Sequence, residues 1–140
     1  MAFLQQLSTP ITLLWGITLA MLLVYAPFLV VASERLKLGY DIAAPRAMFD
    51  KLPAFAQRAT WAHQNSFEAF SLFAAGALMA YVTEVNSPLA IVAVIAHLVA
   101  RFLYSVFYIL NVPLLRSLMF GIGGLGTATL VVLSLLQLQP

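Results

Sequence analysis

The sequence of 140 residues contains no cysteine and little charge: 7 Lys+Arg and 5 Asp+Glu together make up 9% of the chain. Without cysteine, the chain cannot form disulfides, use a thiol nucleophile of its own or hold a metal with thiolates. Soluble domains carry about 25% charged residues, whereas this chain is 63% hydrophobic and lacks the polar side chains to cover a compact body in water. The composition therefore predicts an integral membrane protein.

Two further absences exclude classes of partner. No basic run with interleaved aromatic residues occurs, so the net charge of +2 does not indicate nucleic-acid binding. The chain has 2 histidines, His63 and His97, and no HExxH pattern. Because protein zinc sites need three or four ligands of this kind, we expect no metal.

Four apolar stretches are long enough to cross a hydrocarbon core of roughly 30 Å, which takes about 20 helical residues. They lie near residues 11–32, 58–82, 88–110 and 115–137. We expect Pro27 to kink the first, because proline removes a helix hydrogen bond. No internal repeat is present. The sequence thus predicts an all-α fold, an integral membrane four-helix bundle that forms one domain over residues 1–140.

Basic residues predict the orientation of the chain. Residues 33–57, which we expect to form a loop, hold four of the seven basic residues, and the other three lie nearest the same side. Loops on the cytoplasmic side carry an excess of Lys and Arg. We therefore expect this loop in the cytoplasm and both termini on the opposite side of the membrane.

Polar side chains recur at helical spacing inside the spans. Arg58, Asn65 and Glu68 share one face of the second span. The third span carries a polar and aromatic stripe made of His97, Arg101, Tyr104, Tyr108 and Asn111. Ionisable residues within a span are costly and indicate function by default. Arg101 is the natural partner for Glu68, and two interpretations stay open: a structural ion pair, or a pair that also borders a ligand site.

Arg116 and Ser117 open the fourth span. An arginine beside the free N–H groups of a helix start can hold an anionic ligand, and it can equally anchor the helix at the lipid headgroups. The glycines of residues 121–126 follow no strand and lie inside an apolar span, so a dinucleotide loop is excluded. We expect them to form a helix-packing surface, with Gly123 and Thr127, and Gly124 and Ala128, as small residues four apart.

The segment RATWAHQNSFE, residues 58–68, resembles the second helix of the MAPEG superfamily, the membrane-associated proteins in eicosanoid and glutathione metabolism, in its bacterial-type members. The similarity continues at ARFLYSVFY, residues 100–108, and on to Pro113 and residues 116–117. The resemblance implies a homotrimer that holds glutathione between neighbouring protomers, in the cytoplasmic half of the membrane.

The resemblance also implies site residues. Arg116 and Ser117 match the pair implicated in thiolate activation and are the expected catalytic residues. The residues expected to bind glutathione are Arg35, Arg58, Asn65, Glu68, Arg101, Tyr104 and Tyr108. At two positions where glutathione-using members carry arginine, this chain has Trp61 and Gln64. Fewer cations predict weaker binding of a peptide with two carboxylates.

The sequence therefore predicts a membrane-bound enzyme, similar to glutathione transferases and peroxidases, that joins or reduces hydrophobic electrophiles with a thiol. Its expected partners are the lipid bilayer, further copies of itself and hydrophobic small molecules. One alternative is a non-catalytic member of the family whose polar cluster is structural. A less favoured alternative is a small multidrug transporter, which needs a free membrane carboxylate, whereas Glu68 has candidate arginine partners.

Overall fold

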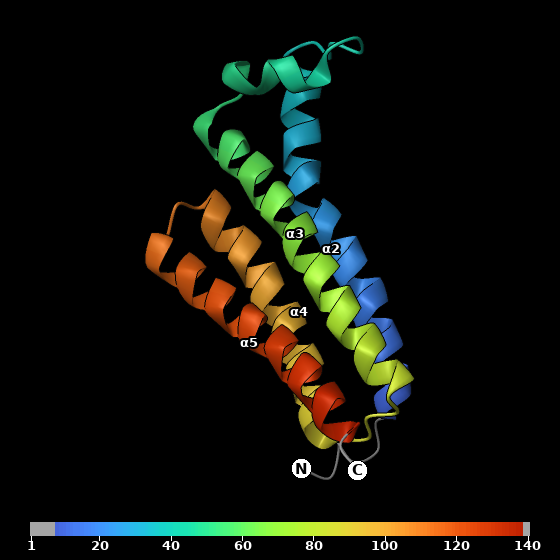
Figure 1. Ribbon diagram of the computed structural model, residues 1–140. Coiled ribbons are helices and arrows are strands. Elements are labelled where there is room, and N and C mark those ends of the chain that lie inside the picture. The colour runs from blue at the N-terminus through green and yellow to red at the C-terminus, as the bar shows by residue number, and fades with distance from the viewer. Residues whose placement is uncertain (1–7, 139–140) are drawn as a thin grey trace.

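The computed structural model describes residues 8–138, which form four long helices and one short 3-10 helix (Figure 1). In chain order they are α2 (Thr9–Lys37), η1 (Pro45–Lys51), α3 (Ala54–Val82), α4 (Pro88–Ile109) and α5 (Pro113–Gln137). The remaining residues of the expected domain, 1–7 and 139–140, lie outside the described residues, and with them the two termini whose side of the membrane was predicted.

The helix boundaries follow from local sequence. Proline occupies the first turn of α2, α4 and α5, where its missing N–H has no partner to lose. The Ser87 side chain accepts a hydrogen bond from the Leu89 N–H at 3.2 Å and so caps the start of α4. Glu84 and Asn111, with φ of 56° and 60°, sit in the two tight turns that follow α3 and α4. The three helices α3, α4 and α5 are therefore joined by short connections.

The first two helices are longer than the sequence predicted. α2 continues to Lys37 instead of ending near residue 32, and α3 begins at Ala54 instead of near residue 58. Lys37 forms an ion pair with Glu34, one turn away, and basic residues in a last turn favour the helix dipole, which accounts for the extension of α2. The expected loop of residues 33–57 thus shrinks to the segment between Lys37 and Ala54, which contains η1.

Three of the long helices, α2, α4 and α5, are long and apolar enough to cross a membrane. α3 carries Arg58, Asn65 and Glu68 and does not reach the same apolarity among the described residues. Figure 1 shows α2 changing direction partway along its length, and Pro27 lies in its interior. A proline at this position removes a helix hydrogen bond, which is the physical cause expected for such a bend.

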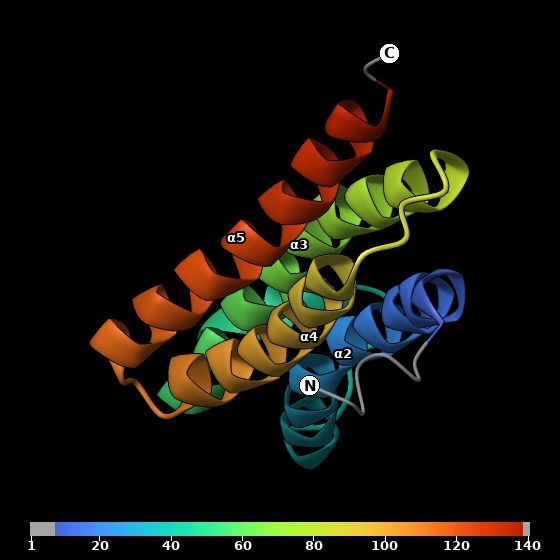
Figure 2. The ribbon, with the colours of Figure 1, turned by 90° about the horizontal axis from the view of Figure 1, so that it is seen from below.

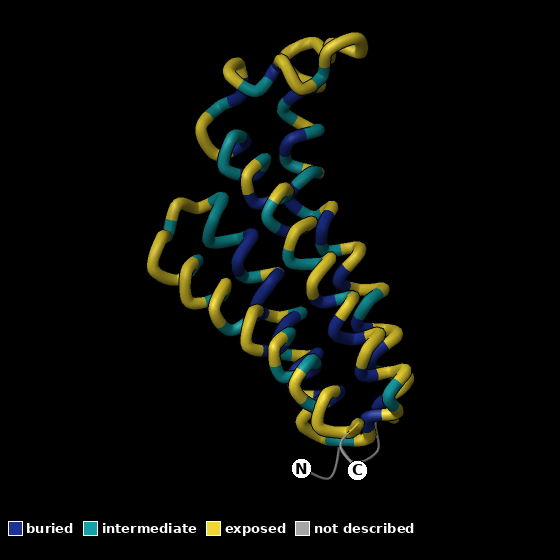
Figure 3. The backbone as a smooth tube through the Cα atoms, viewed as in Figure 1, coloured by how far each residue is buried: buried dark blue, intermediate teal, exposed yellow. Residues whose placement is uncertain are grey.

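The helices pack so that α3 and α4 each contact all the other long helices, with α2 and α5 on either side of them (Figures 1 and 2). Figure 3 shows buried positions along the facing sides of the helices and exposed positions along their outer sides. Phe73, Leu13, Val94 and Leu130 are buried at the centre. The outer sides carry many exposed apolar side chains, among them Trp15, 62% exposed. Such a surface suits lipid rather than water.

Glycines allow α4 and α5 to approach closely, as expected, although only some of them contribute. A Cβ on Gly126 would lie 2.7 Å from the backbone oxygen of Ala93, and one on Gly123 would lie 3.3 Å from Arg101 Cδ. A Cβ on Gly124 would meet no atom within 4 Å. The predicted packing role of Gly124 and Ala128 is therefore wrong within the protomer, because this side of α5 faces a groove instead of α4.

Candidate functional site

A buried arginine joins α3 to α4. Arg101, 5% exposed, donates from Nη2 to Asn65 Oδ1 at 3.0 Å and to Ser66 Oγ at 3.1 Å. Its guanidinium carbon also lies 4.2 Å from the centre of the Tyr104 ring, a cation–π distance. Uncharged side chains thus hold the positive charge of Arg101 between α3 and α4.

The expected direct ion pair between Arg101 and Glu68 is wrong within the protomer. Among residues 8–138 the only ion pair is Lys37 with Glu34. Glu68 is exposed and instead accepts a long hydrogen bond, 3.4 Å, from Asn65 Nδ2. Asn65 therefore stands between the cation and the carboxylate. Glu68 keeps most of its hydrogen-bonding capacity for another group, so no arginine of the protomer neutralises this carboxylate within residues 8–138.

A second group of predicted residues gathers where α4 ends and α5 begins. A cavity of about 260 Å³ is lined there by Tyr104, Tyr108, Arg116, Ser117 and Phe120. The Tyr104 and Tyr108 rings meet edge to face at 5.5 Å, and the Arg116 guanidinium carbon lies 4.6 Å from the centre of the Tyr108 ring. Arg116 has no carboxylate partner among the described residues. Its charge is therefore free to meet an anion.

A groove of about 420 Å³ lies beside the first of these groups, along α3 and α5. Asn65, Glu68 and Arg101 line it, and Phe120 borders both this groove and the smaller cavity beside Arg116. Most of the groove wall is apolar. Its apolar lining residues include Leu72, Ala75, Met79, Ala128 and Val131. The groove thus combines polar groups at one end with a surface that suits a hydrophobic molecule.

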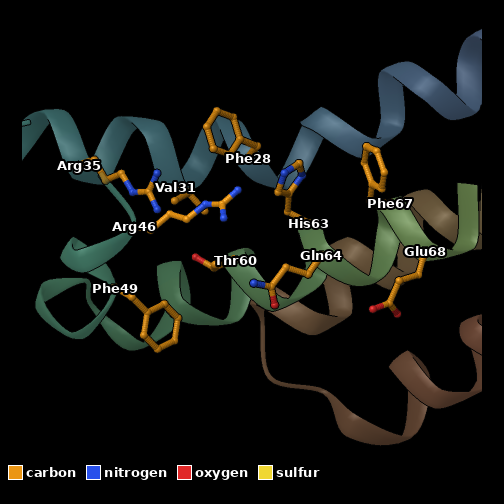
Figure 4. Close-up of a pocket in the computed structure, with 10 residues that line it drawn as sticks. All are labelled: Phe28, Val31, Arg35, Arg46, Phe49, Thr60, His63, Gln64, Phe67 and Glu68. Carbon is orange, nitrogen blue, oxygen red and sulfur yellow. The ribbon is translucent and has the colours of Figure 1, made fainter. Parts of the chain in front are cut away.

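A third space, of about 660 Å³, lies on the other side of Glu68, between α2, η1 and α3 (Figure 4). Its polar wall includes Arg35, which the sequence predicted as a site residue, and also Arg46, His63 and Gln64, which it did not. His63 Nδ1 lies 2.8 Å from the Val24 carbonyl oxygen and its ring packs on Phe28, so this histidine fixes α3 against α2.

Two polar residues of the predicted stripes serve contacts between helices. Arg58 Nε donates to the Ile109 carbonyl oxygen at 3.0 Å and so ties the start of α3 to the end of α4, away from Asn65 and Glu68. His97 is buried, stacks on Phe73 at 3.9 Å and places Nδ1 3.0 Å from the Gly123 carbonyl oxygen. His97 therefore joins α4 to α3 and α5.

The structure thus separates the predicted residues into groups. Arg101, Asn65 and Glu68 meet in one cluster, and Tyr104, which touches Arg101, links that cluster to the cavity of Arg116. Arg35 lines a different space, which Arg46 also lines. Arg46 stands in a polar connection without helical periodicity, so no pattern in the sequence could have placed it there.

The fold and these polar groups define an integral membrane protein with three membrane-capable helices and polar sites between its helices. The sequence matches the MAPEG family over residues 12–136, and the chain belongs to that family. The resemblance found at residues 58–68 is therefore confirmed. A search of curated proteins and a search of solved structures gave no match.

Proposed function

We propose that this protein is a membrane enzyme that uses glutathione, or a similar thiol, to conjugate or reduce hydrophobic electrophiles. The observation that carries the proposal is the cavity at the start of α5, which Arg116, Ser117 and Tyr108 line and where no carboxylate of residues 8–138 pairs with the arginine. A cation and a hydroxyl beside the first turn of a helix favour a thiolate over a thiol.

The chemistry follows from a stabilised thiolate. Arg116 and the Ser117 hydroxyl would hold the sulfur as an anion, which lowers the pKa of the bound thiol. With an aryl halide, the sulfur forms a bond to the ring carbon, halide leaves with the electron pair, and the thiol proton passes to water. With a hydroperoxide, the sulfur attacks the terminal oxygen, the O–O bond breaks and the alkoxide leaves as the alcohol after taking up a proton, so that the thiol becomes a sulfenic acid. A second thiol molecule then attacks the sulfenic sulfur, and the disulfide and water are released.

The groove along α3 and α5 supports a hydrophobic second substrate. Its apolar wall runs from Phe120, which also borders the Arg116 cavity, past Leu72 to Met79. Because such a wall is compatible with lipid-soluble molecules, an electrophile could approach the thiolate from the membrane. Asn65 and Glu68, at the polar end of the groove, would orient the peptide part of the thiol.

For this function we also propose that the protein is a four-helix membrane bundle assembled as a homotrimer. α3 would be the fourth span, although its polar residues make it costly as a lone helix in lipid. Within one protomer, the groups around Arg35 and around Arg116 line separate spaces. Contact between neighbouring protomers would cover exposed polar residues such as Glu68 and Gln64 and would bring two half-sites together. Native mass spectrometry from lipid should show trimers; a stable monomer would contradict this arrangement.

The proposed orientation rests on the basic residues and on which parts of the chain lie at the same end of the molecule. The start of α2, the turn between α3 and α4 and the end of α5 lie at one end of the molecule, and η1 lies at the other (Figure 1). We place η1 in the cytoplasm, on the grounds of its basic residues.

The alternative of a non-catalytic family member is favoured by one observation, namely that Arg101 already has neutral partners in the protomer. Calorimetry of the detergent-solubilised protein with glutathione, followed by a conjugation assay with a generic aryl halide, separates the two. An enzyme binds glutathione and exceeds the uncatalysed rate. A structural protein does neither, and a proton-coupled transporter would instead bind a cationic drug in competition with protons at Glu68.

A further inference from the structure

The chain reverses direction tightly after α4, and backbone hydrogen bonds shape this turn. The last carbonyls of a helix meet no N–H of the same helix. Asn111, with φ of 60°, donates from its backbone N–H to the Tyr108 carbonyl oxygen at 3.2 Å. The N–H of Val112 donates to the Phe107 carbonyl oxygen at 2.9 Å. These are the two bonds of a Schellman motif, which ends α4 at Ile109.

The carbonyl of Ile109 itself is not reached by this motif. In a continuing helix it would accept from the residue four positions ahead, but that residue is Pro113, which has no N–H. Arg58, near the start of α3, supplies the donor, because its Nε lies 3.0 Å from the Ile109 carbonyl oxygen. A cation at this end of a helix also interacts favourably with the helix dipole, and the described last turn of α4 contains no basic residue. Arg58 thus caps α4 from a neighbouring helix.

The side chain of Ile109 supports the same contact between helices. It is half-buried and packs against an apolar cluster made of Val31, Leu52, Ala56 and Ala59. This cluster joins α2 to the start of α3. The carbonyl and the side chain of one residue therefore both hold the end of α4 against α3.

The cavity beside Arg116 is built from the two sides of this turn. Tyr108 belongs to the last turn of α4, whereas Arg116 and Ser117 belong to the start of α5, and all three line the cavity. The N–H of Arg116 donates to the Val112 carbonyl oxygen at 3.0 Å, so α5 begins directly from the turn. A shift of the end of α4 would therefore change how Arg116 lies against Tyr108. Arg58 does not line the cavity and acts on it through the turn.

We propose that Arg58 is a positioning residue for the thiolate site, which holds the turn between α4 and α5 through the Ile109 carbonyl and so fixes Arg116 against Tyr108. This inference rests on the proposed function. It gives Arg58 a different role from the glutathione contact that the resemblance implies. Because a misplacement on the order of 1 Å at a reacting group can lower a rate roughly 100-fold, loss of such a residue affects the chemical step more than binding.

Two variants of similar side-chain length separate the hydrogen bond of Arg58 from its charge. Arg58→Gln places an uncharged amide N–H at the same number of bonds from the backbone as Arg58 Nε, whereas Arg58→Met has no donor. Gln57→Ala is the matched control. Gln57 Nε2 also donates to a backbone carbonyl at 3.0 Å, but that carbonyl belongs to Leu52, before α3, and not to α4.

Conjugation of an aryl halide with glutathione is measured from pH 6 to 9 for each protein in detergent. We expect Arg58→Met to lower kcat roughly 10-fold at neutral pH and to change KM for glutathione less than about twofold, because the bound thiol loses stabilisation by Arg116. The deficit should shrink toward pH 9, where the thiolate forms without help. Arg58→Gln should keep kcat within about threefold of the wild type, and Gln57→Ala within about twofold.

Amide hydrogen exchange without ligand tests the turn itself. Exchange of residues 110–116 should be faster in Arg58→Met than in the wild type, Arg58→Gln and Gln57→Ala, because the N–H groups of Asn111 and Val112 lose protection when the end of α4 loosens. Unchanged exchange in Arg58→Met overturns the inference and leaves the proposed function standing.

The kinetic results can overturn the inference in a second way. If Arg58→Gln and Arg58→Met both raise KM for glutathione and leave kcat unchanged, the charge of Arg58 binds the ligand directly and the positioning role is wrong. If the wild type does not exceed the uncatalysed rate, the proposed function fails and the positioning role in catalysis fails with it. The exchange data then still decide whether Arg58 holds the turn.

Discussion

Arg101 and Arg116 both belong to polar regions at the α4 and α5 side of the molecule, yet their surroundings differ. Arg101 is 5% exposed and donates to Asn65 and Ser66. Arg116 is half-buried and contacts the face of Tyr108. A buried cation that donates to neighbouring side chains contributes to stability, whereas a cation that lines an open cavity and has no carboxylate partner among the described residues is available to a ligand. We therefore expect removal of Arg101 to lower mainly the stability of the protein and removal of Arg116 to lower mainly its activity.

The largest expected effect is on stability. Arg101→Leu leaves Asn65 and Ser66 without their donor, and an orphaned buried acceptor costs about 1 to 3 kcal/mol. We expect the free energy of unfolding in detergent, measured by titration with a denaturing detergent, to fall by about 2 to 4 kcal/mol. Arg116→Leu is the control and should change it by less than about 1 kcal/mol. Equal losses of unfolding free energy in the two variants would show that Arg101 and Arg116 do not differ in their contribution to stability.

The next effect is on catalysis. Without the cation at Arg116, the pKa of the bound thiol should rise and less thiolate should be present at neutral pH. We expect Arg116→Leu to lower the conjugation rate roughly 10- to 100-fold at neutral pH, corresponding to one or two pKa units. The deficit should shrink as the pH rises toward 9, because thiolate then forms without help. A deficit that is constant from pH 6 to 9 would assign another role to Arg116.

A third prediction concerns the packing that holds Arg101 in place. Gly126→Ala puts a methyl group 2.7 Å from the Ala93 carbonyl oxygen, too close for both helices to keep their positions. Such overpacking costs about 1 to 3 kcal/mol. Gly124→Ala is the matched control, because its methyl group meets nothing within 4 Å. Thermal melts that rank the two variants in the reverse order would mean that α5 packs differently against α4.

The smallest stability effect is expected at Glu68, which is exposed and, within residues 8–138, forms only a 3.4 Å hydrogen bond with Asn65. Glu68→Gln should change the free energy of unfolding by less than about 0.5 kcal/mol while weakening glutathione binding. A loss as large as that of Arg101→Leu would show that the two residues form an ion pair after all, across a contact between protomers.

The sequence predicted the helices well because long apolar runs are a strong signal. It also predicted that Arg101 faces inward, since a polar stripe would be unfavourable in lipid. It did not predict which acceptor Arg101 meets. Helical spacing places Asn65 and Glu68 on one face of α3. A small displacement of α4 along α3 decides which of these two side chains Arg101 contacts, and in the structure it is Asn65.

Arg46 was beyond sequence reasoning for a different reason. Its position depends on the path of the chain between Lys37 and Ala54 and on the contact of Phe49 with Trp61. Irregular connections have no periodicity from which such contacts can be derived. Trp61 was interpreted only as the loss of a cation. In the structure it packs against η1, the element that carries another cation.

The proposed function depends on a thiolate that this protein stabilises beside Arg116. Ultraviolet difference absorbance reports it directly, because a thiolate absorbs where a thiol does not. On adding glutathione at neutral pH, we expect a thiolate band with the wild type and with Lys51→Ala, which removes an exposed cation of η1 that does not line the Arg116 cavity, and no band with Arg116→Leu. If the wild type binds glutathione without forming the thiolate band, Arg116 does not stabilise a thiolate.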